Sequence, residues 1–211
     1  MNLFPADAVR GDTGLNGLPA GILCLGAYVL GSIPTGLWLA RARGVDIRAI
    51  GSGNIGATNV ARGLGRSWAV AVLLCDALKG FLPVFVTQRF PSRFSPTVVA
   101  LSGLAAIVGH MFTIFLRGHG GKGVATSLGV ALGLSPPLAL ICLGVYALVY
   151  AGTRLSSVGS LLGIWSFPVV ALIRGHVARE YIALSMGTAL LVTLRHSENI
   201  RRLIRGEEKR A

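Results

Sequence analysis

Long apolar runs separated by short polar segments dominate the chain. There are six such runs, and five of them have the length at which a helix crosses the hydrocarbon core of a bilayer, about 20 residues. The six runs occupy residues 18–40, 67–89, 96–116, 122–152, 156–173 and 178–195. This pattern predicts an all-α, polytopic integral membrane protein built as a helical bundle.

The fourth run is too long for a single crossing. It contains Ser135-Pro136-Pro137, and proline removes a backbone donor and disfavours a helical conformation in the residue before it. Splitting the run there gives segments 122–134 and 137–152. The sequence therefore predicts seven transmembrane segments, of which the fourth is short.

The composition agrees with this class. Hydrophobic residues make up 53% of the 211 positions and charged residues only 13%, whereas soluble domains carry about 25% charged residues. We expect a single membrane-embedded domain over residues 1–211. The formal charge of +12 would suggest nucleic acid in a soluble protein, but no basic segment is interleaved with aromatic residues, and we expect no nucleic-acid partner.

The positive charges are divided unevenly between the two ends of the predicted segments. Residues 41–66 and 195–211 are both rich in arginine, and the cytoplasmic loops of inner-membrane proteins carry such an excess. Placing both on the cytoplasmic side requires an odd number of crossings, and leaves fourteen Lys and Arg there against five on the other side. We expect a multi-pass protein of the bacterial inner (cytoplasmic) membrane, with its N-terminus outside, its C-terminus inside and its active site facing the cytoplasm.

A second topology is compatible with the same charges. If residues 122–134 form only a re-entrant half-helix, five spans with a further segment lying flat also satisfy the pattern. In both cases residues 1–17 are predicted to be mobile and residues 196–211 to form a basic cytoplasmic tail. No removable signal peptide is expected, because no basic start is followed by a cleavage site.

A glycine-rich polar segment follows the first run. Residues 51–59 read Gly-Ser-Gly-Asn-Ile-Gly-Ala-Thr-Asn, and Arg62 comes three positions later. Glycines allow tight turns and let several N–H groups converge on an anion, whereas an ordinary turn needs only one or two. We interpret the segment as a phosphate nest made by Gly51, Ser52, Gly53, Asn54, Thr58, Asn59 and Arg62.

A second glycine-rich segment, residues 118–123, runs directly into an apolar helix. Its N–H groups would meet a helix N-terminus, where the dipole favours an anion. The segment differs from a P-loop because Gly123, not Ser or Thr, follows Lys122, which argues against ATPase activity. The simpler alternative, that Lys122 only anchors a short span, leaves the glycines unexplained. We therefore predict phosphate contacts from Gly120, Gly121, Lys122 and Gly123.

Two polar pairs lie at the ends of later runs. Ser156 and Ser157 fit a helix N-cap, and also fit hydroxyl donors to the same phosphate. His196 and Asn199 are three positions apart and share a helical face. They fit a functional pair and a snorkelling histidine with a polar cap equally well.

A few charges fall elsewhere. Asp76 and Lys79 lie within the second run, where charges are expensive, and we expect them to neutralise each other as a structural pair bordering the site. His110 fits either the core or the site. Asp46, Glu207 and Glu208 are interpreted as solvated loop charges.

Several chemistries lack their signatures. The sequence contains no GxSxG elbow and no HExxH motif, and no histidine is followed by the His-x4-Asp spacing of soluble-domain glycerolipid acyltransferases. The three cysteines are scattered among apolar runs, so no disulfide framework is expected. No metal and no cofactor are predicted. The pairs Gly129/Gly133 and Gly159/Gly163 are interpreted as helix-packing sites.

Five segments, in order over nearly the whole chain, are similar to one family. They are GSGNIGATNVAR, DALKG, GHMFTIFLRGHGGKGVAT, the SSVG step and LRHSENIRRL. The chain resembles the bacterial acyl-phosphate:glycerol-3-phosphate acyltransferases of the PlsY type. The resemblance implies a seven-helix membrane enzyme that transfers an acyl group from acyl phosphate to glycerol 3-phosphate. The products would be 1-acyl-glycerol 3-phosphate (lysophosphatidic acid) and phosphate, in the first acylation of phospholipid synthesis.

The resemblance also implies which residues carry the chemistry. One departure is Thr113, which stands where the family usually has proline. An acyl phosphate is already activated, so the residues fit a direct single-step attack in which positioning and charge stabilisation supply the rate. The catalytic candidates are Ser52, Arg62, Lys122, Ser156, Ser157, His196 and Asn199.

The main alternative is a membrane transporter of an organic phosphate or another anion. Transporters place their sites near the midplane, between related halves, whereas here the polar groups gather on one face and no second half resembles the first. The expected partners are acyl phosphate, glycerol 3-phosphate and the lipid bilayer. The sequence sets no oligomeric state, and a monomer is the simplest case.

Overall fold

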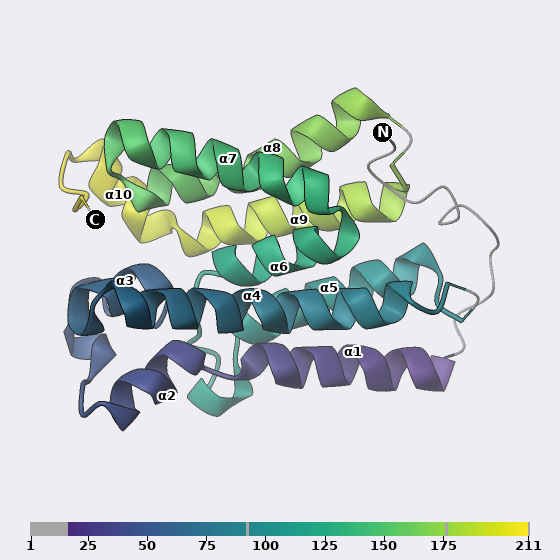
Figure 1. The fold of residues 1–211 in the computed structure, drawn as a ribbon, viewed down its shortest axis with the longest axis horizontal. Coiled ribbons are helices and arrows are strands. Elements are labelled where there is room, and N and C mark those ends of the chain that lie inside the picture. The colour runs from purple at the N-terminus through teal and green to yellow at the C-terminus, as the bar shows by residue number, and fades with distance from the viewer. Residues whose placement is uncertain (1–16, 92, 176, 211) are drawn as a thin grey trace.

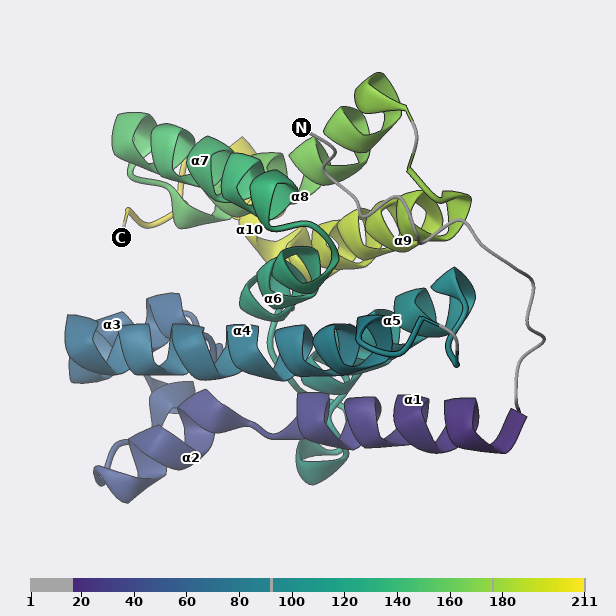
Figure 2. The same cartoon turned by 45° about the vertical axis from the view of Figure 1, so that its right-hand side comes forward.

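The computed structural model describes residues 17–91, 93–175 and 177–210, and every regular element in this part of the chain is an α-helix or a 3-10 helix. The helices form two layers, with α6 lying between them (Figures 1 and 2). This confirms the predicted all-α architecture. Residues 1–16 of the N-terminal segment predicted to be mobile lie outside the described residues.

The first half of the chain forms one layer. In it α1 packs on α5, and α4 packs on both α3 and α5. Its elements are α1 (Gly17–Ser32), α2 (Thr35–Ala42), η2 (Ile47–Ala49), α3 (Ala57–Leu64), α4 (Arg66–Gln88), α5 (Pro96–Met111) and η3 (Ile114–Leu116).

The second half of the chain forms the other layer and the short helix α6 between the two layers. The short helix α6 packs on α4 on one side and on α7 on the other, and α8 packs on α7 and α9. The elements are α6 (Val124–Leu134), α7 (Pro136–Thr153), α8 (Ser156–Arg174), α9 (Arg179–Arg195) and α10 (Ser197–Ile204).

Prolines set two of the helix boundaries. Helix α6 ends at Leu134 and α7 begins at Pro136, which confirms the predicted break. The run predicted over residues 18–40 forms one candidate span, Pro19–Ala42, but its helix is interrupted, because α1 ends at Ser32 and α2 begins only after Pro34. Proline disfavours a helical conformation in the residue before it, here Ile33. The carbonyl of Ile33, at this interruption, accepts a hydrogen bond from Lys79 at 2.9 Å.

Among the described residues, five helical stretches are long and apolar enough to cross a membrane: Pro19–Ala42, Arg66–Gln88, Pro96–Leu116, Pro136–Thr153 and Ser156–Arg174. The two other predicted segments correspond to α6 and α9, which have 11 and 17 residues. Their length alone does not assign them as spans. The count of seven therefore stays a prediction.

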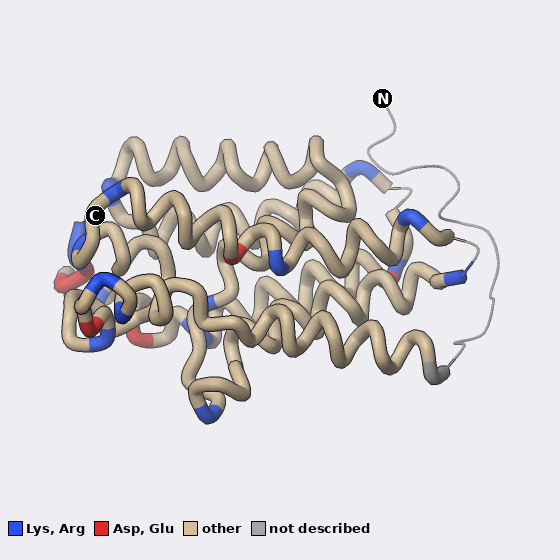
Figure 3. Tube along the Cα trace, turned by 60° about the horizontal axis from the view of Figure 1, so that its bottom comes forward, with Lys and Arg blue, Asp and Glu red and all other residues tan. Residues whose placement is uncertain are grey.

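The basic residues mark one end of the bundle. Most Lys and Arg positions lie at the end that holds α3, α10 and the turn between α7 and α8 (Figure 3). The predicted loop 41–66 and the predicted tail 196–211 both lie here, and each contains helix: α2, η2 and α3 in the first, α10 in the second. The polar motifs thus meet at one end.

Glycines allow α6 to press against α4. A Cβ atom on Gly129 would lie 1.8 Å from the carbonyl oxygen of Ala77, and one on Gly80 would lie 2.1 Å from that of Thr126. Helices in membranes associate through such small residues because apolar side chains alone gain nothing over lipid. The predicted packing role of Gly129 is confirmed.

We predict that Gly129→Ala destabilises the protein. The added methyl group meets backbone that cannot rotate away, and overpacking of this kind destabilises by about 1–3 kcal/mol, which lowers the midpoint of thermal unfolding by roughly 3–10 °C. The matched control is Gly144→Ala on α7, where a Cβ meets nothing within 4 Å. Equal melting temperatures for the two purified variants would contradict this account of the α4–α6 contact.

Candidate active site

A cavity of about 1010 Å³ lies between the two layers, at the basic end of the bundle. The first turns of four helices line it. These are Ala57 and Thr58 of α3, Val124 and Ala125 of α6, Ser156 and Ser157 of α8, and Asn199 of α10 with its N-cap His196. The first turn of a helix leaves backbone N–H groups without intrahelical partners and carries a partial positive charge. Four helix starts on one cavity favour an anion within it.

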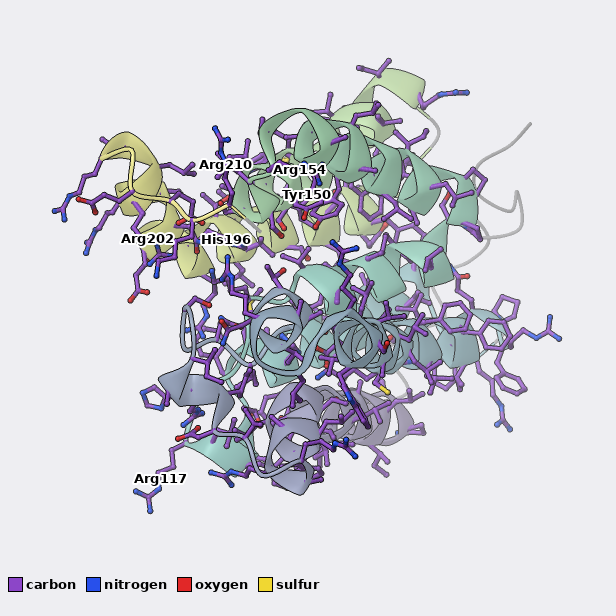
Figure 4. The ribbon with its side chains drawn as sticks, turned by 60° about the vertical axis from the view of Figure 1, so that its left-hand side comes forward. Arg117, Tyr150, Arg154, His196, Arg202 and Arg210 are labelled. Carbon is purple, nitrogen blue, oxygen red and sulfur yellow. The ribbon has the colours of Figure 1, made fainter. Side chains whose placement is uncertain are left out.

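The charged side chains of the cavity also favour an anion. Six basic residues and two acidic residues line the cavity, and both acidic side chains interact with neighbouring groups. The basic residues are Arg62, Arg66, Lys122, Arg154, Arg202 and Lys209, and the acidic ones are Asp76 and Glu208. In Figure 4, Tyr150, Arg154, His196 and Arg202 gather on the side formed by α7 to α10, whereas Arg117 projects away from it.

Asn59 holds the first glycine-rich segment in shape. The Asn59 side chain is buried, accepts a hydrogen bond from the Ser52 N–H at 2.9 Å, and donates to the carbonyls of Ile47 and Ile50. The Gly53 N–H donates to the Ile50 carbonyl. Both N–H groups therefore donate hydrogen bonds within the segment. This corrects the prediction that the backbone N–H groups of Ser52 and Gly53 bind phosphate. Asn59 supports the segment, while Ser52 and Arg62 line the cavity.

The second glycine-rich segment is fixed from both sides. The N–H groups of Gly120 and Gly121 donate to the carbonyls of Met111 and His110, each at 3.0 Å. Arg195 donates to the carbonyls of the same two glycines, at 3.0 Å and 3.3 Å. The prediction that these two amides bind phosphate is corrected, because both N–H groups already donate hydrogen bonds to carbonyls of α5.

Both positions require glycine, because atoms of α5 lie too close for a side chain. A Cβ on Gly120 would lie 2.0 Å from the His110 carbonyl oxygen, and a Cβ on Gly121 would lie 2.1 Å from Nε2 of the His110 ring. His110, which the sequence left between core and site, therefore supports this segment and also lines the cavity. The segment ends at Gly123, where α6 begins without a side-chain cap, so the first-turn amides of α6 are left for a ligand.

Lys122 projects from this fixed segment to the opposite layer. Its ammonium donates to Oδ1 of Asn199 on α10. Burial lowers the pKa of Lys122 to about 8, and the nearby Arg202 acts in the same direction. The cation nearest to the start of α6 is therefore partly neutral in mildly alkaline solution.

The turn between α7 and α8 presents the two serines. Arg154 adopts a left-handed conformation, with φ 60°, that ends α7 and lets α8 start two residues later. The Ser156 hydroxyl lies 3.2 Å from both the Thr58 and the Tyr146 hydroxyls. It thereby links α8 to α3 and α7 at the cavity wall.

Glu208 is a site residue that the sequence reading misassigned. Its side chain is only 9% exposed, accepts hydrogen bonds from Ser157 and Asn199, and pairs with Arg202 at 2.7 Å. Burial raises the pKa of Glu208, but the hydrogen bonds from Asn199, Arg202 and Ser157 outweigh it and lower the pKa overall. The prediction of a solvated charge is wrong. The contacts link α8 to α10.

His196 is buried beside Lys122 with a defined tautomer. Its Nδ1 lies 2.8 Å from the Val192 carbonyl, and because a carbonyl only accepts, Nδ1 carries the proton and Nε2 is left as an acceptor. Burial, and after it the charge of Lys122, lowers the pKa of His196 to about 4. At neutral pH the ring is therefore an uncharged hydrogen-bond acceptor on the cavity wall.

The predicted pair in α4 is present. Oδ1 of Asp76 lies 2.8 Å from Nζ of Lys79, and Nδ1 of His110 lies 3.8 Å from the same carboxylate oxygen. Asp76 lines the cavity, whereas Lys79 is directed to the helix break at Ile33.

The structure brings together most of the residues predicted from sequence. Gly53 and Gly120 line a smaller neighbouring hollow of about 350 Å³, which shares Lys122 with the main cavity. Gly121 and Lys79 line neither. The main cavity is lined by Gly51, Ser52, Asn54, Thr58, Asn59, Arg62, Asp76, Lys122, Gly123, Ser156, Ser157, His196 and Asn199.

The cavity continues into an apolar slot between α6, α7 and α8. Its walls include Leu128 and Ala131 of α6, Leu143 of α7, and Ile164 and Phe167 of α8. A cationic end formed by helix N-termini and joined to an apolar slot inside a helical membrane bundle is the arrangement expected of an enzyme that acts on a phosphorylated lipid.

Comparison with known proteins gives the family. Residues 21–206 match the model of the glycerol-3-phosphate acyltransferase family, and the chain belongs to this family. Among its relatives, the glycerol-3-phosphate acyltransferase of Geobacter sulfurreducens is 50% identical over 90% of this chain and 96% of its own length. That of Geotalea daltonii is 48% identical over 89% of this chain and 95% of its own length.

Two solved structures have the same fold. Both are crystal structures of PlsY, an integral membrane glycerol 3-phosphate acyltransferase. The glycerol 3-phosphate form aligns with a TM-score of 0.87 at 38% identity over 92% of this chain and 96% of that chain. The lysophosphatidic acid form aligns with a TM-score of 0.84 at 38% identity over 91% and 95%. The protein is thus an integral membrane glycerol-3-phosphate acyltransferase of phospholipid synthesis, and the transporter alternative is set aside.

We predict a loss of activity at alkaline pH that reports Lys122. Below about pH 8 the ammonium is charged and attracts phosphate, and as the pH rises through the pKa of about 8 this charge is lost. The ratio kcat/KM for glycerol 3-phosphate, measured against pH, should therefore fall above about pH 8. In Lys122→Arg the guanidinium stays charged, so whatever activity remains should not show this fall. A wild-type profile without an alkaline fall would contradict the assignment.

Proposed function

We propose that the protein transfers an acyl group from acyl phosphate to glycerol 3-phosphate, giving 1-acyl-glycerol 3-phosphate and phosphate. The observation that carries the proposal is the single cavity in which four helix N-termini and six basic residues adjoin an apolar slot. Both substrates bear a phosphate, and one bears a fatty chain, so a cationic end with an apolar extension suits the pair. The glycerol 3-phosphate and lysophosphatidic acid forms of the similar structures support this substrate and product.

The contacts of the two serines favour direct transfer. Ser156 is engaged by Thr58 and Tyr146, and Ser157 donates to Glu208. Neither serine is hydrogen-bonded to His196 among the described residues, whereas a serine nucleophile needs an adjacent base. An acyl phosphate already carries a good leaving group, so no covalent intermediate is needed.

The reaction then has one chemical step. The primary hydroxyl oxygen of glycerol 3-phosphate attacks the acyl carbonyl carbon, the bond from that carbon to the phosphate oxygen breaks, and phosphate departs with the electron pair. The hydroxyl proton passes to a phosphate oxygen. Before the attack, Nε2 of His196 accepts a hydrogen bond from glycerol 3-phosphate and orients it. The ring does not take up the proton in the step, because a ring with a pKa of about 4 is a poor proton store at neutral pH.

The basic residues and helix starts stabilise the charge that develops. Arg62 and Lys122 lie on opposite segments of the cavity wall, and α6 and α8 direct their N-termini to the same space. Fixed donors and dipoles in a partly dehydrated site stabilise a developing anion more strongly than water does. Ser52, Ser157 and Asn199 add neutral hydrogen-bonding groups on the same wall.

We further propose seven spans in the bacterial inner membrane, with the N-terminus outside and the cavity facing the cytoplasm. The gathering of basic residues at the cavity end of the bundle supports this orientation. In this topology the shorter helices α6 and α9 also cross the membrane, and together with the five longer spans they make seven.

The donor and the mechanism are tested together with purified protein. We expect phosphate release from acyl phosphate that depends on glycerol 3-phosphate, and no product from acyl-CoA. Incubation with labelled acyl phosphate alone, followed by quenching and intact-mass analysis, should show no adduct. A stoichiometric acyl adduct on Ser156 or Ser157 that glycerol 3-phosphate removes would replace the single-step scheme by a covalent one, and equal turnover of acyl-CoA would overturn the donor.

The orientation is tested by cysteine labelling of intact cells. Cysteines introduced at Val45 and Lys209 should react only with reagents that reach the cytoplasm, and one introduced at Arg93 should react from outside. The native cysteines, Cys24, Cys75 and Cys142, are first replaced by alanine. If positions 45 and 209 react from opposite sides, the number of crossings is even and the seven-span topology is wrong.

A further inference from the structure

We infer that Phe167 closes the membrane end of the apolar slot and sets the length of acyl chain that the enzyme prefers. The inference rests on the proposed function, since it places the acyl chain of the donor and product in this slot. It concerns chain-length selection, which neither the family nor the fold assigns.

The slot begins at the level of the cationic groups. Ser156 and Ser157 start α8 at the cavity, and Lys122 lies two residues before the start of α6. From there the lining continues down one face of α8 through Ser160, Gly163, Ile164 and Phe167. Positions three and four apart share a helical face, so these residues form one continuous wall parallel to the helix axis.

The far end of this wall is closed. Phe167 is only 4% exposed, and Ala131 of α6 and Cys142 of α7, which line the cavity at the same end, are 3% and 8% exposed. Beyond them Leu134, Leu138 and Ala171 pack into a continuous buried core with Phe167. A chain entering from the cationic end therefore meets a wall of side chains here.

The slot changes from small to large residues along its length. Ser160 is a small residue in the first part of the wall, whereas a Cβ on Gly163 would lie 3.0 Å from the Cys142 carbonyl oxygen, so α7 and α8 approach closely at Gly163. Phe167 is the first bulky aromatic side chain on this wall of α8. Its ring is the group that an acyl terminus would contact.

The depth matches a common fatty chain. Phe167 is eleven residues beyond Ser156, which is about 16 Å along a helix axis. An extended chain advances about 1.2 Å per bond, because three backbone bonds of an extended peptide span about 3.6 Å. The slot thus takes a chain of roughly fourteen carbons before the terminal methyl group reaches Phe167. We expect the wild type to prefer myristoyl to stearoyl donors.

Two variants should shift this preference in opposite directions. Phe167→Ala opens the end of the slot, so the ratio of kcat/KM for stearoyl over myristoyl donor should rise about tenfold, as two further buried methylenes would give. Ile164→Phe fills the slot about three-quarters of the way along and should shift the preference toward lauroyl. The matched control is Phe81→Ala on α4, outside the cavity lining, which should leave the ratio unchanged.

The measured quantity is the ratio of kcat/KM between donors of two chain lengths, with the type of donor that the wild type uses. A failure of the acyl-phosphate donor is therefore seen in the wild type, separately from a failure of the length selection. Gel filtration and thermal unfolding in detergent confirm that each variant is folded, and Phe167→Leu serves if alanine is not tolerated. If the chain-length profiles of the Phe167 variants and Ile164→Phe coincide with that of the wild type, the acyl chain does not end at Phe167 and the inference is wrong.

Discussion

The site depends on the absence of side chains where the segment around Gly120 and Gly121 crosses α5. There the backbone lies against the carbonyl and the ring of His110, and a single methyl group on either glycine would overlap them. This contact uses the amides of both glycines, and it fixes where Lys122 and the start of α6 lie. A larger residue would move the cation and a helix N-terminus together, because both follow within three residues.

The shortness of α6 is the second condition. A full-length helix in its place would fill the space between the two layers, whereas α6 stops short of the left-hand end that α3, α4 and α7 reach in Figure 2. The cavity lies at that end. Glycines on both α4 and α6 then bring these two helices into contact. The anion-binding end is thus a product of packing as much as of the basic residues that line it.

The sequence predicted what depends on local composition. The break at Pro136, the ion pair of Asp76 with Lys79, and the gathering of the polar motifs at one end could all be inferred from spacing and charge. It did not predict which amides remain free, because the partners of Gly120 and Gly121 lie on a neighbouring helix. Glu208 was misassigned for the same reason. Its partner Ser157 is 51 positions away in the chain, and only the folded bundle brings the tail to α8.

Part of the cavity wall is made of side chains that also lie on the outer surface of the bundle. Val70 and Leu73 of α4 and Leu143 of α7 line the cavity, yet they are 53%, 39% and 42% exposed on the outer surface of the bundle, where hydrocarbon surrounds the protein. The two products of the proposed reaction would then part without sharing a route. Phosphate diffuses into water in three dimensions, while the acylated product slides sideways into one leaflet, and its chain need not cross water before the next enzyme meets it in the plane of the membrane.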